Sequence, residues 1–315
     1  MSFYKDKKVV VTGGSGFVGT NFILELLDRG AKVTTHTHIR PMKIQDDRIN
    51  VIENIDLFKL DDCIKLLDGA DYVIHCGGNI TNPTEVRTNV QVLLHNINST
   101  GNILEATSKC GLQGYLDINS STGYPDRRYP VTEEEYWDEE PHDSYFGYGW
   151  MRRYKEKMME FVHGFSDFKV GLARGTATFG PYDNFNLKTC HVVPALINRV
   201  LGNENPLIVW GNKDVVRDFL YIKDLVNGAL LVLEKGESMR PYNLGAGNPI
   251  TIGQILDGVI SATNKNPIVE WDESKPTTIP FRMVNTDRIK SELGFKQEWT
   301  FEQGLQETID WYLEN

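Results

Sequence analysis

The chain has 315 residues, 40% of them hydrophobic, so it can bury a substantial core in one or two domains. A formal net charge of -10 argues against a nucleic-acid partner, which needs clustered Lys and Arg. No apolar run approaches the length that spans a membrane, so no membrane partner is expected. The four cysteines lack the spacing of zinc ligands and the density of a disulfide scaffold, which predicts reduced thiols, no metal site and a cytoplasmic protein.

The first half of the chain alternates short apolar runs with helical patterns, which is typical of βαβ units and a parallel sheet. Strands are predicted over residues 8–12, 31–37, 50–53, 71–76 and 114–119. Helices are predicted between them over residues 17–28, 61–67 and 90–109. This order predicts an α/β fold with a Rossmann-type, doubly wound parallel sheet.

The second half of the chain is less regular and is punctuated by Gly and Pro. Short strands mix there with helices such as 192–201 and 301–313. We therefore expect a dinucleotide-binding Rossmann domain over residues 1–172 and a smaller, mixed α/β substrate-binding lobe over 173–315. The segment at about 217–245 is expected to return to the first domain.

A glycine-rich motif, Gly-Gly-Ser-Gly-Phe-Val-Gly, occupies residues 13–19 between the first strand and the first helix. In that context the pattern predicts a dinucleotide site. Gly13 permits a tight turn, Gly16 lets a pyrophosphate approach the backbone, and Gly19 lets the helix pack closely on the sheet. The free amides where the helix begins, at Phe17 and Val18, would face the anion.

The end of the second strand bears on the choice of cofactor, because an acid there binds both ribose hydroxyls and repels a 2'-phosphate. The segment 37–40, Thr-His-Ile-Arg, carries no acid. Arg40, with His38 beside it, suits a phosphate, which favours NADP while NAD stays possible. A solvated loop arginine is the alternative. Asp56, after the third strand, is placed to contact adenine.

Two separated hydroxyls, Ser120 and Tyr148, are candidates for handling a proton. Hydride transfer to a carbonyl leaves an alkoxide that needs a proton and hydrogen-bond donors. Tyr148 would supply the proton and Ser120 would hydrogen-bond the same oxygen. Arg152 stands one helical turn after Tyr148, where a Tyr-x-x-x-Lys pattern would have lysine. Its charge can do the electrostatic part of lysine's work, although its larger planar head changes how a nicotinamide ribose is held.

The chain resembles the extended short-chain dehydrogenase/reductase family (NAD-dependent epimerase/dehydratase), and within it the GDP-fucose synthases, nearly from end to end. Besides the motifs above, the resemblance rests on residues 102–106, 120–125, 180–185, 191–196, 217–224 and 243–247. It implies a GDP-linked or similar nucleotide-linked 4-keto sugar as substrate. It also implies a homodimer, in which the helix of Asn96 and the helix of Tyr148 pack into a four-helix bundle.

The resemblance makes the residue two after Ser120 informative about the reaction. GDP-fucose synthases have a cysteine there and 4,6-dehydratases a glutamate, whereas this chain has Thr122. A threonine hydroxyl is a poor base, which argues against dehydration. His191 is then left as a lone acid/base candidate for epimerisation, and capping or packing at the start of its helix is its alternative role.

For the substrate, the resemblance places four side chains toward the nucleotide-sugar: Arg199, Trp210, Arg217 and Arg282. Arginine suits a pyrophosphate through paired hydrogen bonds, although each arginine by itself is more often a surface charge. The first hypothesis is therefore an NADP-dependent reductase of a nucleotide-linked, GDP-type 4-keto-6-deoxy sugar, with 3,5-epimerase activity in question. The alternatives are a nucleotide-sugar 4-epimerase that retains its NAD(P) and a non-catalytic NADP-binding protein.

Overall fold

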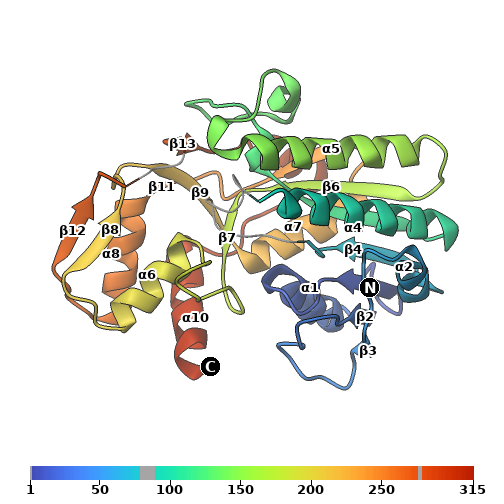
Figure 1. Ribbon diagram of the computed structural model, residues 1–315, viewed down its shortest axis with the longest axis horizontal. Coiled ribbons are helices and arrows are strands. Elements are labelled where there is room, and N and C mark those ends of the chain that lie inside the picture. The colour runs from blue at the N-terminus through green and yellow to red at the C-terminus, as the bar shows by residue number, and fades with distance from the viewer. Residues whose placement is uncertain (1, 79–88, 276–278) are drawn as a thin grey trace.

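The computed structural model describes residues 2–78, 89–275 and 279–315, and it confirms the doubly wound parallel sheet (Figure 1). Seven strands pair in the order β10-β6-β5-β4-β1-β2-β3, every neighbouring pair parallel. They are β1 (Lys8–Thr12), β2 (Lys32–His36), β3 (Asn50–Ile52), β4 (Tyr72–His75), β5 (Gly114–Ser120), β6 (Lys169–Gly175) and β10 (Pro241–Leu244). All four residues of β4 are buried, as expected for a strand that helices cover on both faces.

Helices cover both faces of this sheet. One face carries α2 (Leu60–Leu67), α4 (Val90–Lys109) and α5 (Phe146–His163), and the other carries α1 (Phe17–Asp28), α7 (Ile222–Lys235) and α9 (Asp287–Leu293). The elements predicted for residues 8–119 agree with the structure to within one residue at either end. Their apolar patterns are strong because the inner strands are buried on both faces and each helix on one, whereas none of the residues of β3, at the edge of the sheet, is buried.

The smaller lobe is built from two short sheets and three helices, at the left of Figure 1. One sheet joins β7 (Ala177–Phe179), β9 (Val216–Tyr221), β11 (Pro249–Thr251) and β13 (Phe281–Arg282), and β8 (Leu207–Trp210) pairs with β12 (Val269–Asp272). The helices are α6 (Val192–Leu201), α8 (Ile252–Thr263) and α10 (Phe301–Glu314). The expected boundary at residue 172 falls inside β6, and the segment expected to return supplies β10 to the large sheet.

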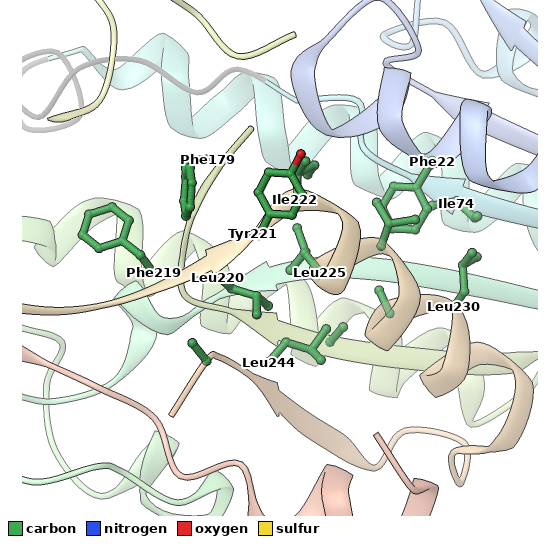
Figure 2. Close-up of a cluster of buried hydrophobic side chains, with 14 of the residues drawn as sticks. Phe22, Ile74, Phe179, Phe219, Leu220, Tyr221, Ile222, Leu225, Leu230 and Leu244 are labelled. Atoms are coloured by element: carbon green, nitrogen blue, oxygen red, sulfur yellow. The ribbon is translucent and has the colours of Figure 1, made fainter. Parts of the chain in front are cut away.

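A continuous apolar core, to which α7 contributes, joins the lobe to the large sheet (Figure 2). Side chains from β4, β7, β9, β10, α1 and α7 meet there, and those labelled in Figure 2 are Phe22, Ile74, Phe179, Phe219, Leu220, Tyr221, Ile222, Leu225, Leu230 and Leu244. Burying each such side chain contributes about 1.5–3 kcal/mol. This shared core fixes the position of β9 relative to the carboxyl ends of the large sheet, where open α/β folds bind ligands.

Three short 3-10 turns connect β5 to α5: η1 (Ser121–Gly123), η2 (Glu133–Trp137) and η3 (Asp143–Tyr145). Figure 1 shows this connection as the green segment above α5. It carries the chain from the carboxyl end of β5 to the first turn of α5, so Ser120 and Tyr148 stand at its two ends.

Candidate active site

The glycine motif forms the turn between β1 and α1 that a dinucleotide phosphate requires. Gly13 has a φ of +68°, which favours glycine, and a Cβ there would lie 2.8 Å from the Cys76 carbonyl oxygen. A Cβ on Gly19 would lie 2.3 Å from the Gly13 carbonyl oxygen, so only glycine lets α1 pack this closely. α1 begins at Phe17, which leaves its first amides, including those of Phe17 and Val18, without carbonyl partners in the helix. This cradle fits a pyrophosphate.

His36 supports this turn, and sequence reasoning missed it. It ends β2, is buried, and its Nε2 accepts a hydrogen bond from the Gly13 amide at 3.2 Å. Burial lowers the pKa of His36 to about 4, so the imidazole is neutral near pH 7 and Nε2 is free to accept. The one feature of the sequence that could have indicated this role is a histidine at the end of the second predicted strand.

The residues predicted to bind the adenosine end lie beyond β2. His38 and Arg40 are exposed and line a cavity of about 570 Å³ that Ile49 and Glu53 also border. Asp56 follows β3, and its Oδ1 accepts a hydrogen bond from the Phe58 amide at 3.0 Å. Their roles toward a cofactor stay predictions.

Tyr148 and Arg152 lie together on one face of α5, as their spacing predicted. The Arg152 Nη2 donates a hydrogen bond to the Tyr148 hydroxyl at 2.5 Å, and Nη1 donates to the Ile118 carbonyl of β5 at 3.1 Å. Both side chains are buried. Burial alone would lower the pKa of Arg152, but Tyr148 and Asp117 together raise it. A fixed cation is therefore held against the tyrosine oxygen, where it stabilises negative charge.

The Ser120 hydroxyl receives two hydrogen bonds from Thr122. The Thr122 amide and the Thr122 hydroxyl each donate to Ser120 Oγ at 3.2 Å. Because these donors occupy the acceptor sites of Ser120, its own proton is left to donate elsewhere. A Cβ on Gly149 would lie 2.8 Å from the Thr122 carbonyl oxygen, so glycine at 149 lets this turn abut the first turn of α5. The structure thus brings Ser120 and Thr122 to the helix of Tyr148.

A buried polar network anchors α5 to the sheet below Tyr148. Asn119 donates to Glu156 Oε1 at 2.6 Å and to the Arg152 carbonyl at 3.2 Å. Arg174 on β6 binds both oxygens of Glu156, at 2.9 and 2.7 Å. A paired, hydrogen-bonded buried ion pair of this kind fixes geometry, because breaking it leaves an uncompensated charge. Sequence reasoning did not assign Asn119 or Arg174, because their partner becomes adjacent only in the folded sheet.

His191 stands at the first position before α6 and makes no capping hydrogen bond with its side chain. The ring is solvent-accessible, while partial desolvation by the surrounding protein lowers its pKa below the ordinary value. Capping, one of the structural alternatives for this residue, is therefore not what the side chain does. An acid/base role for it stays a prediction.

The predicted substrate side chains divide into two groups. Arg217 and Arg282 are cross-strand partners in the register of β9 and β13. Arg282 donates to the carbonyls of Pro125 and Tyr124, in the loop just after η1, at 3.0 and 3.2 Å. Burial lowers the pKa of Arg282 to about 10, although Asp126 opposes this. Two neighbouring, largely desolvated guanidiniums thus lie beside the loop that follows η1, and their role toward an anion stays a prediction.

The other two predicted substrate residues lie in different surroundings. Arg199 donates to both oxygens of Glu204 at 2.6 and 2.5 Å and to the Ile208 carbonyl at 2.6 Å. Trp210 is 68% exposed, with Lys275 5.6 Å from its ring centre. Within the described part of the chain, no hydrogen bond or ion pair joins Arg199 or Trp210 to Arg217 or Arg282.

Comparison with known proteins identifies the family. The sequence model of the NAD dependent epimerase/dehydratase family matches residues 9–245. The chain belongs to this family. It is 28% identical to "Probable GDP-L-fucose synthase 1" of Oryza sativa subsp. japonica over 327 aligned positions, covering 100% of this chain and 95% of that protein.

Two solved structures show the same fold. The UDP-glucose 4-epimerase of Thermotoga maritima superposes with a TM-score of 0.88 at 21% identity, covering 98% of this chain and 99% of that one. A GDP-L-fucose synthetase from Naegleria fowleri gives a TM-score of 0.82 at 24% identity, covering 100% and 95%. The seven-stranded sheet and its flanking helices are thus the architecture of this family.

Membership of the NAD dependent epimerase/dehydratase family makes this chain an NAD(P)-dependent enzyme, as predicted. The cradle of glycines 13–19 fits the cofactor of that chemistry. The hydroxyls of Ser120 and Tyr148, with the cation of Arg152, fit its proton transfer. Within residues 2–78, 89–275 and 279–315, no three His, Cys, Asp or Glu side chains gather as metal ligands would. Among the same residues, no helix has the length and apolarity needed to cross a bilayer.

Proposed function

We propose that the enzyme is an NADP-dependent reductase of a nucleotide-linked 4-keto-6-deoxy sugar, with GDP as the favoured nucleotide. The observation that carries this proposal is the 2.5 Å hydrogen bond between Arg152 and the Tyr148 hydroxyl, beside the Ser120 turn. A phenol held by a permanent cation can release its proton to a nearby alkoxide, because the charge left behind is compensated. The similarity to "Probable GDP-L-fucose synthase 1" of Oryza sativa supports the nucleotide and sugar class.

The reaction adds a hydride and a proton to the C4 carbonyl, which becomes a secondary alcohol, as NADPH becomes NADP+. NADPH, when bound in the cradle of glycines 13–19, supplies the hydride. Tyr148 gives its phenolic proton to the sugar oxygen, and Arg152 faces the negative oxygen that remains. Ser120 donates a second hydrogen bond to the same sugar oxygen, since Thr122 fills its acceptor sites. Arg217 and Arg282 bind the diphosphate.

The deciding experiment supplies purified enzyme with NADPH and a GDP-linked 4-keto-6-deoxyhexose, and follows NADPH absorbance and the sugar product together. We expect one NADPH oxidised per alcohol formed, and slower oxidation of NADH. A 4-epimer formed from a nucleotide-sugar without NADPH consumption would instead establish the 4-epimerase alternative. Binding of NADP without turnover of GDP-, UDP- or dTDP-linked 4-keto sugars would establish the non-catalytic alternative.

We also propose that reduction proceeds without epimerisation at C3 and C5. The Thr122 hydroxyl donates its proton to Ser120, so it is engaged within the protein and is a poor base. His191 alone would then face the carbons beside the ketone. Run in deuterium oxide, the reaction should leave C3 and C5 without deuterium. Stoichiometric incorporation at either carbon would contradict this part of the proposal.

We propose that the enzyme works as a homodimer formed through α4 and α5. Apolar side chains on α5 are exposed at Phe146, Trp150, Tyr154 and Phe161, which repeat along one side of the helix. Such a row favours burial against a second copy. Sedimentation equilibrium should give twice the mass of the chain, and the double substitution of Tyr154 and Phe161 by Glu should give a monomer. A monomeric unmodified protein would contradict the proposal.

A further inference from the structure

Behind Tyr148 lies a buried ion pair that the proposed chemistry does not use directly. Lys155 Nζ lies 2.7 Å from Asp117 Oδ1, and the two side chains are 4% and 0% exposed. Asp117 lies within β5, an inner strand of the large sheet, and Lys155 follows Arg152 by three residues on α5, on the same side of the helix. Removing two charges from water is costly, and a hydrophobic pair often serves stability as well or better. The pair therefore calls for a functional explanation.

Asp117 is also close to Arg152. The Arg152 Nη1 donates to the carbonyl of Ile118, the residue next to Asp117, and Asp117 contributes to raising the pKa of Arg152 against the opposing effect of burial. Arg152 Nε and Asp117 Oδ2 are both buried, and neither has a hydrogen-bond partner in the described part of the chain. The guanidinium and the carboxylate are thus neighbours that do not bind one another.

The hydrogen bonds of Asp117 explain this arrangement. Its Oδ1 accepts from Lys155 and also from the Tyr115 hydroxyl at 3.3 Å. Burial alone would raise the pKa of Asp117, but Lys155 lowers it, so the carboxylate is charged. A charged carboxylate without Lys155 would offer both oxygens to the nearest guanidinium, because the two-pronged arginine–carboxylate pair is among the strongest in proteins. That guanidinium belongs to Arg152.

We propose that Lys155 is a positioning residue for Arg152: by holding the Asp117 carboxylate, which would otherwise bind the guanidinium, Lys155 keeps Arg152 on the Tyr148 hydroxyl. The inference rests on the proposed function, because it assigns importance to the Arg152 contact through proton donation by Tyr148. Tyr148, Arg152 and Lys155 then share one face of α5. Arginine contacts the phenol, and the lysine lies about one turn further along the helix. Neither Lys155 nor Asp117 touches substrate or cofactor in this assignment.

Two single substitutions separate positioning from a purely structural role. Lys155→Met leaves the Asp117 carboxylate free to capture Arg152, whereas Asp117→Asn removes the competing charge and leaves Arg152 where it is. Both should lower the thermal midpoint, since each leaves a buried group without its partner. Only Lys155→Met should lower kcat, by about tenfold or more, with the KM for the sugar and the Kd for NADP unchanged. The double variant Asp117→Asn, Lys155→Met should recover kcat.

The matched control is Lys157→Met, on the same helix, whose lysine is exposed and pairs with Glu160 at 2.7 Å. It should change neither kcat nor the thermal midpoint. The proposal is overturned if Lys155→Met keeps kcat, or if kcat in both single variants falls in step with stability. If Lys155→Met does not fold, the double variant decides: a folded double variant with low kcat also overturns the proposal.

A crystal structure of Lys155→Met gives a readout that needs no activity. We expect the Arg152 guanidinium to leave the Tyr148 hydroxyl and bind both Asp117 oxygens. If the unmodified enzyme turns over no sugar-nucleotide, the proposed function fails while this structure still tests the positioning role of Lys155. An Arg152 that stays on Tyr148 in the variant refutes the positioning role of Lys155 even in an active enzyme.

Discussion

The Arg152 guanidinium donates to the Tyr148 hydroxyl across 2.5 Å, one helical turn away on α5. Arginine keeps its proton under all conditions in which proteins fold, so this position supplies charge and cannot pass a proton on. In the proposed reaction, Tyr148 therefore regains its proton from a group other than Arg152. With arginine in place of lysine, position 152 can therefore stabilise negative charge but cannot take part in a proton relay.

Removing the phenolic oxygen should abolish the chemistry and spare the cofactor. Tyr148→Phe keeps the ring that packs with Val92 and Met151, so the fold should be unaffected. A general acid contributes about a hundredfold to ten-thousandfold to a rate, and we expect kcat to fall within that range. The NADP Kd, measured by fluorescence titration, should change by less than about twofold, since the glycine cradle is untouched. Retention of most of the activity would remove Tyr148 as proton donor.

Arg152→Lys keeps the charge but cannot bridge Tyr148 and the Ile118 carbonyl, because an ammonium is a point charge without the planar fork. Arg152→Met removes the charge as well. We expect kcat to fall about tenfold in the lysine variant and about a hundredfold or more in the methionine variant. Steady-state kinetics with saturating sugar would show this order. Equal losses in the two variants would mean that shape, and not charge, is what position 152 contributes.

The fold could be predicted from the sequence because its signal is local. Strands such as β4 are buried at every residue and mostly apolar, and helices such as α1 have one apolar side, so their bounds follow from the apolar pattern. The Tyr148 and Arg152 contact was predictable for the same reason, since a spacing of four residues places two side chains on one helix face. The glycine motif was readable because its position between strand and helix is also local.

The remaining parts of the site depend on register between distant segments, which no local pattern contains. Asp117 in a central strand looks like an isolated polar residue until α5 packs on β5 and brings Lys155 to it. In the same way, Arg217 and Arg282 become neighbours only through the pairing of β9 with β13. The Thr122 hydroxyl was interpreted from its chemistry alone, and its bond to Ser120 depends on the η1 turn.

Thr122→Val tests whether that bond orients Ser120. Valine keeps the shape of the side chain and the hydrogen bond from the backbone amide but removes the hydroxyl donor. The Ser120 hydroxyl can then also turn its proton away from the sugar oxygen. A hydrogen bond of this kind contributes about 0.5–1.5 kcal/mol, which predicts a kcat lower by about twofold to twelvefold at unchanged NADP affinity. Thr122→Ser retains the hydroxyl and should restore the rate. A serine variant as slow as the valine variant would show that the methyl group, not the hydroxyl, matters.

Asp183 should make the enzyme less stable as the pH rises. Burial raises the pKa of Asp183 to about 7, with the Asn184 amide and Lys43 opposing, and its Oδ2 has no partner among the described residues. An unfolded chain releases this proton near pH 4 and the folded chain near pH 7, so the folded state binds more protons in between. The contribution of Asp183 to stability is therefore complete below pH 4 and is lost as the pH rises through 7.

Asp183→Asn removes this titration and keeps the shape of the side chain. The free energy of unfolding of the wild type, minus that of the variant, should fall between pH 5 and pH 8, at up to about 1.4 kcal/mol for each pH unit crossed. Urea denaturation at three pH values measures it. Asp138→Asn, at an exposed position in the η2 loop, controls for the loss of one carboxylate. A difference that is flat or that rises with pH would show that Asp183 is already ionised in the folded enzyme at pH 5, so that the loop before His191 carries a buried charge instead of a buried acid.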